Sequence, residues 1–460
     1  MYKIDFDSHS HVYFLGIGGI SMSGLAEILR NAGFIVSGSD RVASDITRGL
    51  EKKGITVKYG ESSSHLPADL DFAVLTSAVK ETNPELRALR ERGIPCLSRA
   101  QLLGQLMKNY QISVAVSGTH GKTTTTSMIS EILLKAGTDP TLSIGGILKS
   151  IGGNIRIGGS RYFVTEACEY TNSFLSFSPT VGLILNIEED HMDFFKDLAD
   201  IRNSFRRFAE LLPEDGCLII SADIPDYREL TEGLSCRIIT FSCVSGAADY
   251  YPSAISYDDF GHPSFLLHSP GRPAEGFSLK VPGLHNIGNA VAAAALADYL
   301  AVDRPVTISA LREYAGTDRR FEYKGSVGGV TIIDDYAHHP TEITATLSAA
   351  QKYPHKTLWC VFQPHTYSRT KEFMGDFAKA LSLSDRVVLA DIFPARETDH
   401  LGISSETLQA EIRALGHDCD YFPTFDEIEN FLLENCINGD LLITMGAGDV
   451  HKIGENLLGS

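Results

Sequence analysis

The stretch Ile112-Ser113-Val114-Ala115-Val116-Ser117-Gly118-Thr119-His120-Gly121-Lys122-Thr123-Thr124-Thr125-Thr126-Ser127-Met128-Ile129-Ser130-Glu131-Ile132-Leu133-Leu134-Lys135-Ala136 decides the fold of this chain. It opens with an apolar, β-rich run, and its later apolar positions 128, 129, 132, 133 and 136 recur at helical spacing. The sequence therefore predicts a buried strand that leads into a helix through a Gly-Lys-Thr turn, which is the layout of a phosphate-binding loop.

Each residue type in this loop has a chemical reason to be there. Glycines let backbone N–H groups turn toward a polyphosphate, the helix N-terminus adds a favourable dipole, a lysine neutralises phosphate charge, and the next hydroxyl can bind Mg²⁺. Gly121, Lys122 and Thr123 fill these roles. The loop departs from the general G-x-x-x-x-G-K-[ST] pattern, because Val116 replaces its first glycine and the earlier glycine is Gly118. A surface turn with a stray lysine is the alternative interpretation.

Length and composition set limits on the kind of protein. A chain of 460 residues with 43% hydrophobic content can bury large cores and suggests about three domains. No segment approaches 18 consecutive apolar residues and the N-terminus lacks a signal-peptide core, so we expect a cytoplasmic protein without a membrane partner. Eight cysteines without a C-x-x-C pair indicate reduced thiols. A net charge of −18 opposes nucleic-acid binding, although glycine loops, Mg²⁺ and a few cations can still hold an anionic nucleotide.

The N-terminal part repeats the order strand, glycine turn, helix. Its turn reads Gly16-Ile17-Gly18-Gly19-Ile20-Ser21, and a second apolar strand ends at Asp40, where a dinucleotide-binding fold has an acidic residue for a ribose. Ser21 replaces the third glycine of G-x-G-x-x-G, so the fingerprint alone is weak. Ser77 follows a later apolar strand at 72–75, at the edge where open α/β sheets bind ligands. The pattern restarts at Ile112, which predicts a Rossmann-like domain over residues 1–107.

A central domain over residues 108–322 contains the phosphate loop and a candidate metal site. Glu166 and His191 follow two apolar strands, and parallel strands would bring both to the sheet edge that carries Lys122. Together with Thr123 they could bind Mg²⁺, although imidazole is an unusual ligand for this ion. The alternative is that Glu166 caps a helix and His191 is a hydrogen-bonded loop residue.

Two asparagines begin a helix rich in small residues. Asn286 and Asn289 are three positions apart, so they share a helical face and could meet a purine edge or a ribose together. Helix capping is the alternative, and it suits Asn286 better.

A third α/β domain over residues 323–460 has strands at 330–333, 357–362, 386–389 and 441–444. Polar clusters follow three of these strands, each at the ligand edge of the sheet, which favours a binding site over surface histidines. Arg369 offers a planar fork for a carboxylate, His338, His339 and His365 could complete that pocket, and Tyr336 could limit its size. The clusters read Asp334-Asp335-Tyr336-Ala337-His338-His339-Pro340, Gln363-Pro364-His365-Thr366-Tyr367-Ser368-Arg369, and Met445-Gly446-Ala447-Gly448-Asp449.

These motifs together resemble the Mur ligase family, the ATP-dependent amide-forming enzymes of bacterial peptidoglycan precursor synthesis. The resemblance covers nearly the whole chain, and the short phosphate loop that misfits the general pattern fits this family. The Asp-Asp-Tyr-x-His-His-Pro and Pro-His-x-Tyr-x-Arg strings are similar to those of the alanine-adding branch and of its relative, the muropeptide-recycling ligase. Further matching runs are Glu166-Ala167-Cys168-Glu169, Asp190-His191-Met192-Asp193, His285-Asn286-Ile287-Gly288-Asn289-Ala290 and Arg319-Arg320-Phe321.

The resemblance implies three α/β domains: a Rossmann-like N-terminal domain, a central P-loop ATPase-like domain and a C-terminal Rossmann-like domain. It implies that ATP and Mg²⁺ are used to activate the carboxylate of UDP-N-acetylmuramate for attack by L-alanine, and that the first glycine loop binds a UDP-sugar. By this resemblance the catalytic residues are Lys122, Arg320, Asp335 and His338, and the Mg²⁺ ligands are Thr123, Glu166 and His191. The residues implied to bind the nucleotide are Gly118, Thr119, His120, Gly121, Lys122, Thr123, Thr124, Asn286, Asn289 and Arg320. The residues implied to bind the UDP-sugar are Gly16, Gly18, Gly19, Ser21, Asp40 and Ser77.

Two departures refine the expectation. No lysine occurs between Lys196 and Lys280, which disfavours the branches that use a carbamylated lysine and add glutamate or a diamino acid. Thr366 stands where many relatives have an arginine, so Arg369 would carry more of the carboxylate binding. The alternatives are a ligase that adds a tripeptide, an NAD-dependent dehydrogenase built on residues 16–40, and a non-catalytic nucleotide-binding module. We expect a monomer or weak homodimer.

Overall fold

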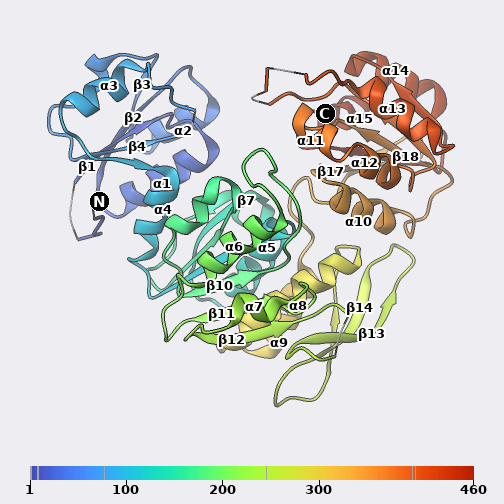
Figure 1. Ribbon diagram of the computed structural model, residues 1–460, viewed down its shortest axis with the longest axis horizontal. Helices are drawn as coiled ribbons and strands as arrows, with labels where there is room; N and C mark the ends of the chain where they lie inside the picture. Colours follow the sequence, from blue (N-terminus) through green and yellow to red (C-terminus); the bar gives the residue numbers. More distant parts are fainter. Residues whose placement is uncertain are drawn as a thin grey trace.

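The computed structural model describes residues 3–7, 10–76, 78–244, 246–395, 397–398 and 400–459. The chain builds four β-sheets, of which three are wholly or mainly parallel and one is a small antiparallel sheet. Figure 1 shows the N-terminal sheet in blue and the C-terminal sheet in orange and red on either side of a larger central part. The predicted α/β architecture is confirmed. The boundaries at 107/108 and 322/323 stay predictions; α4 ends at Met107 and β16 begins at Glu322.

The N-terminal sheet is all parallel, with strand order β3-β2-β1-β4-β5. The order reverses between β1 and β4, and in open α/β sheets such a switch point opens a crevice at the carboxyl ends of the strands. The glycine turn after β1 lies at this crevice. The elements are β1 (His11–Leu15), α1 (Ile20–Asn31), β2 (Ile35–Asp40), α2 (Asp45–Lys52), β3 (Thr56–Tyr59), η1 (Ser63–His65), β4 (Phe72–Leu75), α3 (Pro84–Glu91), β5 (Cys96–Ser98) and α4 (Arg99–Met107).

The central sheet has the order β12-β11-β10-β6-β9-β7-β8, and only the edge strand β8 runs antiparallel to its neighbour. The phosphate-loop strand β6 is buried between β10 and β9, so the ends of all three strands converge on one edge. A three-stranded antiparallel sheet, β13-β14-β15, was not predicted. The elements are β6 (Ile112–Ser117), α5 (Lys122–Lys135), β7 (Thr141–Leu148), η2 (Lys149–Ile151), β8 (Gly153–Arg156), β9 (Tyr162–Glu166), η3 (Tyr170–Ser176), β10 (Val181–Ile184), α6 (Leu198–Ala209), β11 (Cys217–Ser221), α7 (Tyr227–Thr231), β12 (Arg237–Phe241), β13 (Tyr251–Tyr257), β14 (Pro263–His268), β15 (Glu275–Ser278), α8 (Leu284–Tyr299) and α9 (Arg304–Glu313).

The C-terminal sheet has the order β16-β17-β21-β18-β19-β20, parallel except for β16. The four strands predicted here are present, and β17, β18 and β21 are neighbours, so the three polar clusters lie side by side. The elements are β16 (Glu322–Val327), β17 (Val330–Asp335), α10 (Pro340–Ala350), β18 (Leu358–Phe362), α11 (Tyr367–Glu372), α12 (Met374–Leu381), β19 (Arg386–Leu389), α13 (Ser405–Ala414), β20 (Cys419–Tyr421), α14 (Phe425–Asn435), β21 (Leu441–Met445) and α15 (His451–Leu458).

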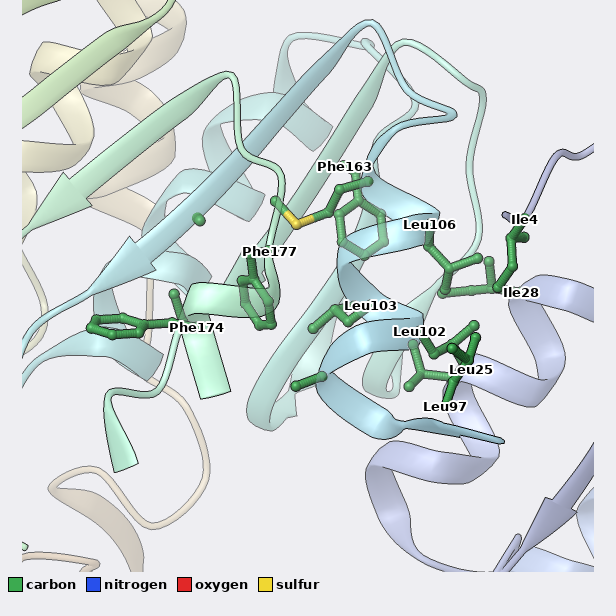
Figure 2. Packing of buried hydrophobic residues seen from close by; sticks show 14 of the residues in the cluster. Ile4, Leu25, Ile28, Leu97, Leu102, Leu103, Leu106, Phe163, Phe174 and Phe177 are labelled. Atoms are coloured by element: carbon green, nitrogen blue, oxygen red, sulfur yellow. The ribbon is translucent and has the colours of Figure 1, made fainter. Parts of the chain in front are cut away.

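One hydrophobic core runs without interruption from the N-terminal sheet into the central part. Helix α4 lies between them: Figure 2 shows Leu102 and Leu106 against residues of α1, and Leu103 on the side of Phe177. Burial of each large apolar side chain contributes about 1.5 to 3 kcal/mol, so this shared core holds the two parts together.

Gly104 of α4 is buried against the backbone of η3. A Cβ at this position would lie 1.9 Å from the carbonyl oxygen of Ser176, and that oxygen belongs to the main chain and cannot swing away. We therefore expect Gly104→Ala to lower the free energy of unfolding by about 1 to 3 kcal/mol in a urea titration. Gly49→Ala is the matched control, because Gly49 is also in a helix but has nothing within 4 Å of the added carbon. An unchanged urea midpoint for Gly104→Ala would show that α4 and η3 are not in close contact.

Candidate active site

Three adjoining cavities lie along the carboxyl edges of the sheets. We call them the nucleotide pocket, of about 380 Å³, the phosphate cavity, of about 520 Å³, and the wide cavity, of about 1110 Å³. The first two share His120, Gly121, Arg320 and Glu342, and the last two share Cys168, Asp190 and His191 among their lining residues. The phosphate cavity therefore adjoins both the nucleotide pocket and the wide cavity, and the wide cavity reaches the N-terminal glycine turn at Gly19.

The phosphate loop joins β6 to α5 as predicted. Gly121 caps α5 with a φ of 82°, a conformation that favours glycine. The Lys122 ammonium donates to the carbonyl oxygen of Thr119, at 3.0 Å, and forms an ion pair of 3.1 Å with the Glu169 carboxylate. Burial alone would lower the pKa of Lys122, but Glu169 outweighs it and the pKa is raised. Lys122 is therefore a fixed positive charge at the mouth of the loop.

Thr123 and Glu166 lie together beside the phosphate loop. Glu166 ends β9 directly opposite Val116 of β6, which places it one strand from the loop. Its carboxylate accepts hydrogen bonds from the Thr123 hydroxyl, at 3.1 Å, and from the Gly145 N–H, at 2.6 Å. The capping alternative for Glu166 does not apply, because its partners lie on α5 and β7.

His191 lines the same phosphate cavity, and its backbone adopts a φ of 55°. Burial lowers the pKa of His191, so its imidazole is neutral and offers a lone pair. A hydroxyl, a carboxylate and a neutral imidazole around one polar cavity fit a divalent cation, and the oxygens of Thr123 and Glu166 suit Mg²⁺. The three residues remain the proposed Mg²⁺ ligands.

If these residues bind the metal, Glu166→Ala and His191→Ala should each raise the Mg²⁺ concentration needed for half-maximal phosphate release by about tenfold or more. The reason is that each variant removes one donor while leaving the phosphate loop in place. Titration of Mg²⁺ at fixed ATP measures the effect, with His262→Ala as a control, since His262 pairs with Asp258 outside these cavities. Two variants with the parental Mg²⁺ dependence would remove both residues from the metal site.

The nucleotide pocket brings both asparagines of α8 together with two residues near the C-terminal sheet. The side chain of Asn289 donates to Asn286, at 3.1 Å, and Asn286 donates to the Pro282 carbonyl oxygen, at 2.7 Å. Asn286 therefore does not cap α8 through its side chain; the cap residue is Gly283. Arg320 and Asp335 complete this wall of the pocket.

Asp335 is held by two backbone groups. Its carboxylate accepts from the N–H groups of Phe321 and Ala337, both at 2.7 Å. Burial raises the pKa of Asp335 to about 6, although Arg320 acts in the opposite direction. The carboxylate is thus pre-positioned to accept a hydrogen bond from a ligand hydroxyl.

Glu342, on the first turn of α10, connects several of the predicted residues. Its carboxylate lies 3.2 Å from Nδ1 of His120, 3.3 Å from Nδ1 of His338 and 3.9 Å from the guanidinium of Arg320. Burial would raise the pKa of Glu342, but the neighbouring His120 and Arg320 hold it well below its usual value. A charged Glu342 thus ties the C-terminal domain to the phosphate loop.

Arg369 lies between the C-terminal domain and the loop that carries His191. Its guanidinium donates to the Asp190 carboxylate, at 2.8 Å, and to Nδ1 of His365, at 3.2 Å. Both partners of the ion pair are nearly buried, and Arg369, His365 and Asp190 all line the wide cavity. The predicted carboxylate fork is present, but part of it is already occupied by Asp190.

The three histidines predicted for the amino-acid pocket do not lie together. His338 and His365 lie edge to face, with ring centroids 5.7 Å apart, and burial lowers their pKa values to about 3 and about 4, so both are neutral. His339 differs from the prediction: it caps α10 and donates to the Glu189 carbonyl oxygen, at 3.1 Å, and it lines none of the three cavities. Tyr336 lines the phosphate cavity beside His338.

The residues predicted at the N-terminal glycine turn differ in whether they line a cavity, and their role in binding a UDP-sugar stays a prediction. Gly19 and Ser21 line the wide cavity, whereas Gly16, Gly18 and Asp40 do not. Asp40 instead accepts from the Gly18 N–H, at 2.7 Å, and so holds the shape of the turn. The predicted site residue Ser77 lies outside the described residues.

Sequence reasoning assigned no role to three acidic residues that neutralise the cations of the site: Glu169, Asp190 and Glu342. Their positions could have revealed them, because each lies within a few residues of a residue that was predicted to belong to the site. Cys168, between Glu166 and Glu169, is free, and burial raises the pKa of its thiol to about 11, so it is not a thiolate nucleophile. In the described part of the chain, no helix is long and apolar enough to cross a membrane.

With this geometry in hand, comparison with known proteins shows that the chain belongs to the Mur ligase family. It matches the Mur ligase family catalytic domain over residues 11–111, the Mur ligase middle domain over 116–297 and the Mur ligase glutamate ligase domain over 319–448. This membership removes the dehydrogenase interpretation of residues 16–40.

Individual relatives cover the whole chain. The UDP-N-acetylmuramate–L-alanine ligase of Agathobacter rectalis is 57% identical over 458 residues, 100% of both chains, and that of Lachnospira eligens is 56% identical with the same coverage. Among solved structures, the UDP-N-acetylmuramate-alanine ligase of Thermotoga maritima superposes with a TM-score of 0.81 at 28% identity, covering 98% of this chain and 99% of that one. A murein peptide ligase from Psychrobacter arcticus gives a TM-score of 0.71 at 26% identity, covering 98% of each chain.

Proposed function

We propose that this protein is an ATP-dependent ligase that joins L-alanine to the carboxylate of UDP-N-acetylmuramate in peptidoglycan precursor synthesis. The observation that carries the proposal is the row of three adjoining cavities, with the phosphate loop in the middle, in a chain that is 57% identical over its full length to a ligase of that name. The nucleotide pocket would hold ATP, and the wide cavity would hold the UDP-sugar and the amino acid.

The reaction needs carboxylate activation because a free carboxylate resists attack by an amine. A carboxylate oxygen attacks the γ-phosphorus of ATP and ADP leaves; the amine of L-alanine then attacks the acyl carbon and phosphate leaves. Lys122 and Arg320, which both line the phosphate cavity, would offset the charge that develops on the transferring phosphoryl group. Mg²⁺ held by Thr123, Glu166 and His191 would supply further neutralisation of phosphate charge.

The amino-acid end of this row of cavities supports a small substrate bearing a carboxylate. Arg369 lines the wide cavity with His365, while His338 lines the adjoining phosphate cavity. Because His338 and His365 are neutral, they would not hold a carboxylate by charge, and Arg369 would do so. A single guanidinium fork matches the one carboxylate of L-alanine.

Phosphate release from ATP, measured with UDP-N-acetylmuramate and a panel of amines, tests the proposal. We expect release to require both the UDP-sugar and an amine, with L-alanine preferred and glycine or L-serine weaker, since one methyl group is worth about 1 to 3 kcal/mol in such a pocket. Preference for a tripeptide would identify the muropeptide-recycling ligase instead. ATP binding without substrate-dependent release would identify a nucleotide-binding module.

A further inference from the structure

A second group of metal-ligating side chains lies next to the phosphate loop, apart from the three proposed Mg²⁺ ligands. It comprises His120, Glu188 and His339, and one ligand atom from each lies within 4.8 Å of the other two. Nε2 of His120 is 3.5 Å from the Glu188 carboxylate, and the rings of His120 and His339 are 4.7 Å apart. The three residues come from the phosphate loop, the loop after β10, and the start of α10.

We propose that His120, Glu188 and His339 form a site for a transition-metal ion of the Zn²⁺ class that fastens the phosphate loop to the C-terminal domain. Two imidazoles and one carboxylate are a ligand set that Zn²⁺ uses, with room for a water or a further oxygen as the fourth ligand. Imidazole-rich sites select such ions over Mg²⁺, which prefers oxygen. The site is therefore chemically distinct from Thr123, Glu166 and His191.

The orientation of His120 supports this assignment independently of proximity. Its Nδ1 is within hydrogen-bond distance of Glu342, at 3.2 Å, while its Nε2 is buried and has no hydrogen-bond partner among the described residues. A carboxylate on one ring nitrogen, with the other nitrogen directed at the metal position, is the arrangement by which proteins orient a histidine toward zinc. Glu342 thus orients the ring so that Nε2 faces Glu188, and a metal ion would take the place of the Nε2 proton.

Before a metal binds, weaker contacts hold the same three groups. Burial lowers the pKa of His120, but Glu188 and Glu342 outweigh it and raise the pKa to about 9, so a metal displaces a proton from this ring. Glu188 accepts from the Thr341 hydroxyl, at 2.7 Å. His339 donates to the Glu189 carbonyl oxygen, at 3.1 Å, and accepts from the Thr341 N–H, at 3.3 Å. Metal binding would exchange one of the two His339 contacts for a metal bond.

A bound metal would restrain the separation of the two domains that together enclose the nucleotide pocket. Loops and domains that close on a substrate must open to release product, so a metal tie between them slows turnover. This inhibitory consequence rests on the proposed ligase function, whereas the metal site itself does not.

The test is a Zn²⁺ titration of the full chain by calorimetry, without nucleotide or substrate. Glu188→Gln should weaken Zn²⁺ binding by at least ~10-fold, and His339→Asn should do the same while keeping a residue that caps α10. Glu189→Gln is the matched control, because its side chain is exposed in the same loop and carries the same charge. Equal Zn²⁺ affinity in Glu188→Gln, Glu189→Gln and the parent would overturn the site.

Co²⁺ substitution identifies the ligands directly. We expect visible ligand-field bands without the near-ultraviolet thiolate band, because no cysteine belongs to the cluster; a thiolate band would overturn the assignment in favour of the free cysteines. In the ligase assay, Zn²⁺ should inhibit the parent reversibly. Half-maximal inhibition of Glu188→Gln should need about tenfold more Zn²⁺. Binding without inhibition would overturn the restraint on opening. A protein without ligase turnover would refute the proposed function, while the titration would still report on the metal site.

Discussion

Lys122→Ala is expected to lower kcat for substrate-dependent phosphate release by ~10²- to 10³-fold, about 3 to 4 kcal/mol of transition-state stabilisation. The side chain lies at the mouth of the phosphate loop, and its charge is fixed there by Glu169. When ATP is bound, that charge would act on the phosphoryl group as negative charge develops. Stopped-time phosphate assays with saturating ATP, UDP-N-acetylmuramate and L-alanine measure the loss.

The same substitution carries a stability cost that must be separated from the catalytic one. Removing Lys122 leaves the buried Glu169 carboxylate without its partner, which typically costs about 3 to 5 kcal/mol. The double variant Lys122→Ala/Glu169→Gln removes the unpaired charge and should regain thermal stability without regaining turnover. Lys135→Ala is the control, because Lys135 lies on the same helix and forms an exposed pair with Glu313. Turnover near the parental rate in the double variant would end the assignment of Lys122.

Arg369→Ala is expected to raise the apparent KM for L-alanine by ~10²-fold or more and to change that for ATP far less. A bidentate hydrogen bond to a charged carboxylate is about twice as strong as a neutral one, and its loss falls on the amino acid rather than on the nucleotide. Initial rates at varied L-alanine with fixed ATP, and the reverse, give the two constants.

The Arg369–Asp190 ion pair offers a competing explanation, because it links the C-terminal domain to the loop of His191. Asp190→Asn removes the ion pair but leaves the guanidinium in place. If Arg369 binds the amino acid, Asp190→Asn keeps a low KM for L-alanine while Arg369→Ala does not. Equal increases in both variants would mean that Arg369 acts only by joining the domains. Arg413→Ala, at a more exposed arginine of the same domain, controls for loss of charge.

Local sequence determined the elements on which the active site is built. The apolar run at 112–116 and the helical period after Gly121 predicted β6 and α5, because strand and helix periodicities are local properties. The placement of Glu166 at the end of β9 and of His191 after β10 also followed, since parallel strands end at the same edge. The family motifs extended this to the identity of the reaction.

Only the tertiary structure decided which charges meet. Glu169 against Lys122, Glu342 against His120 and Arg320, and Asp190 against Arg369 are contacts between residues separated by 22 to 222 positions. Strand order and domain packing set these distances, and no periodicity in the chain encodes them. The position of His339 was also decided by the tertiary structure. Its place in a run of two histidines predicted a substrate pocket, but at the start of α10 its side chain faces Glu189 and His120. Sequence determined which chemical groups the site contains, and the packing of the three domains decided which of those groups face the cavities and which face each other.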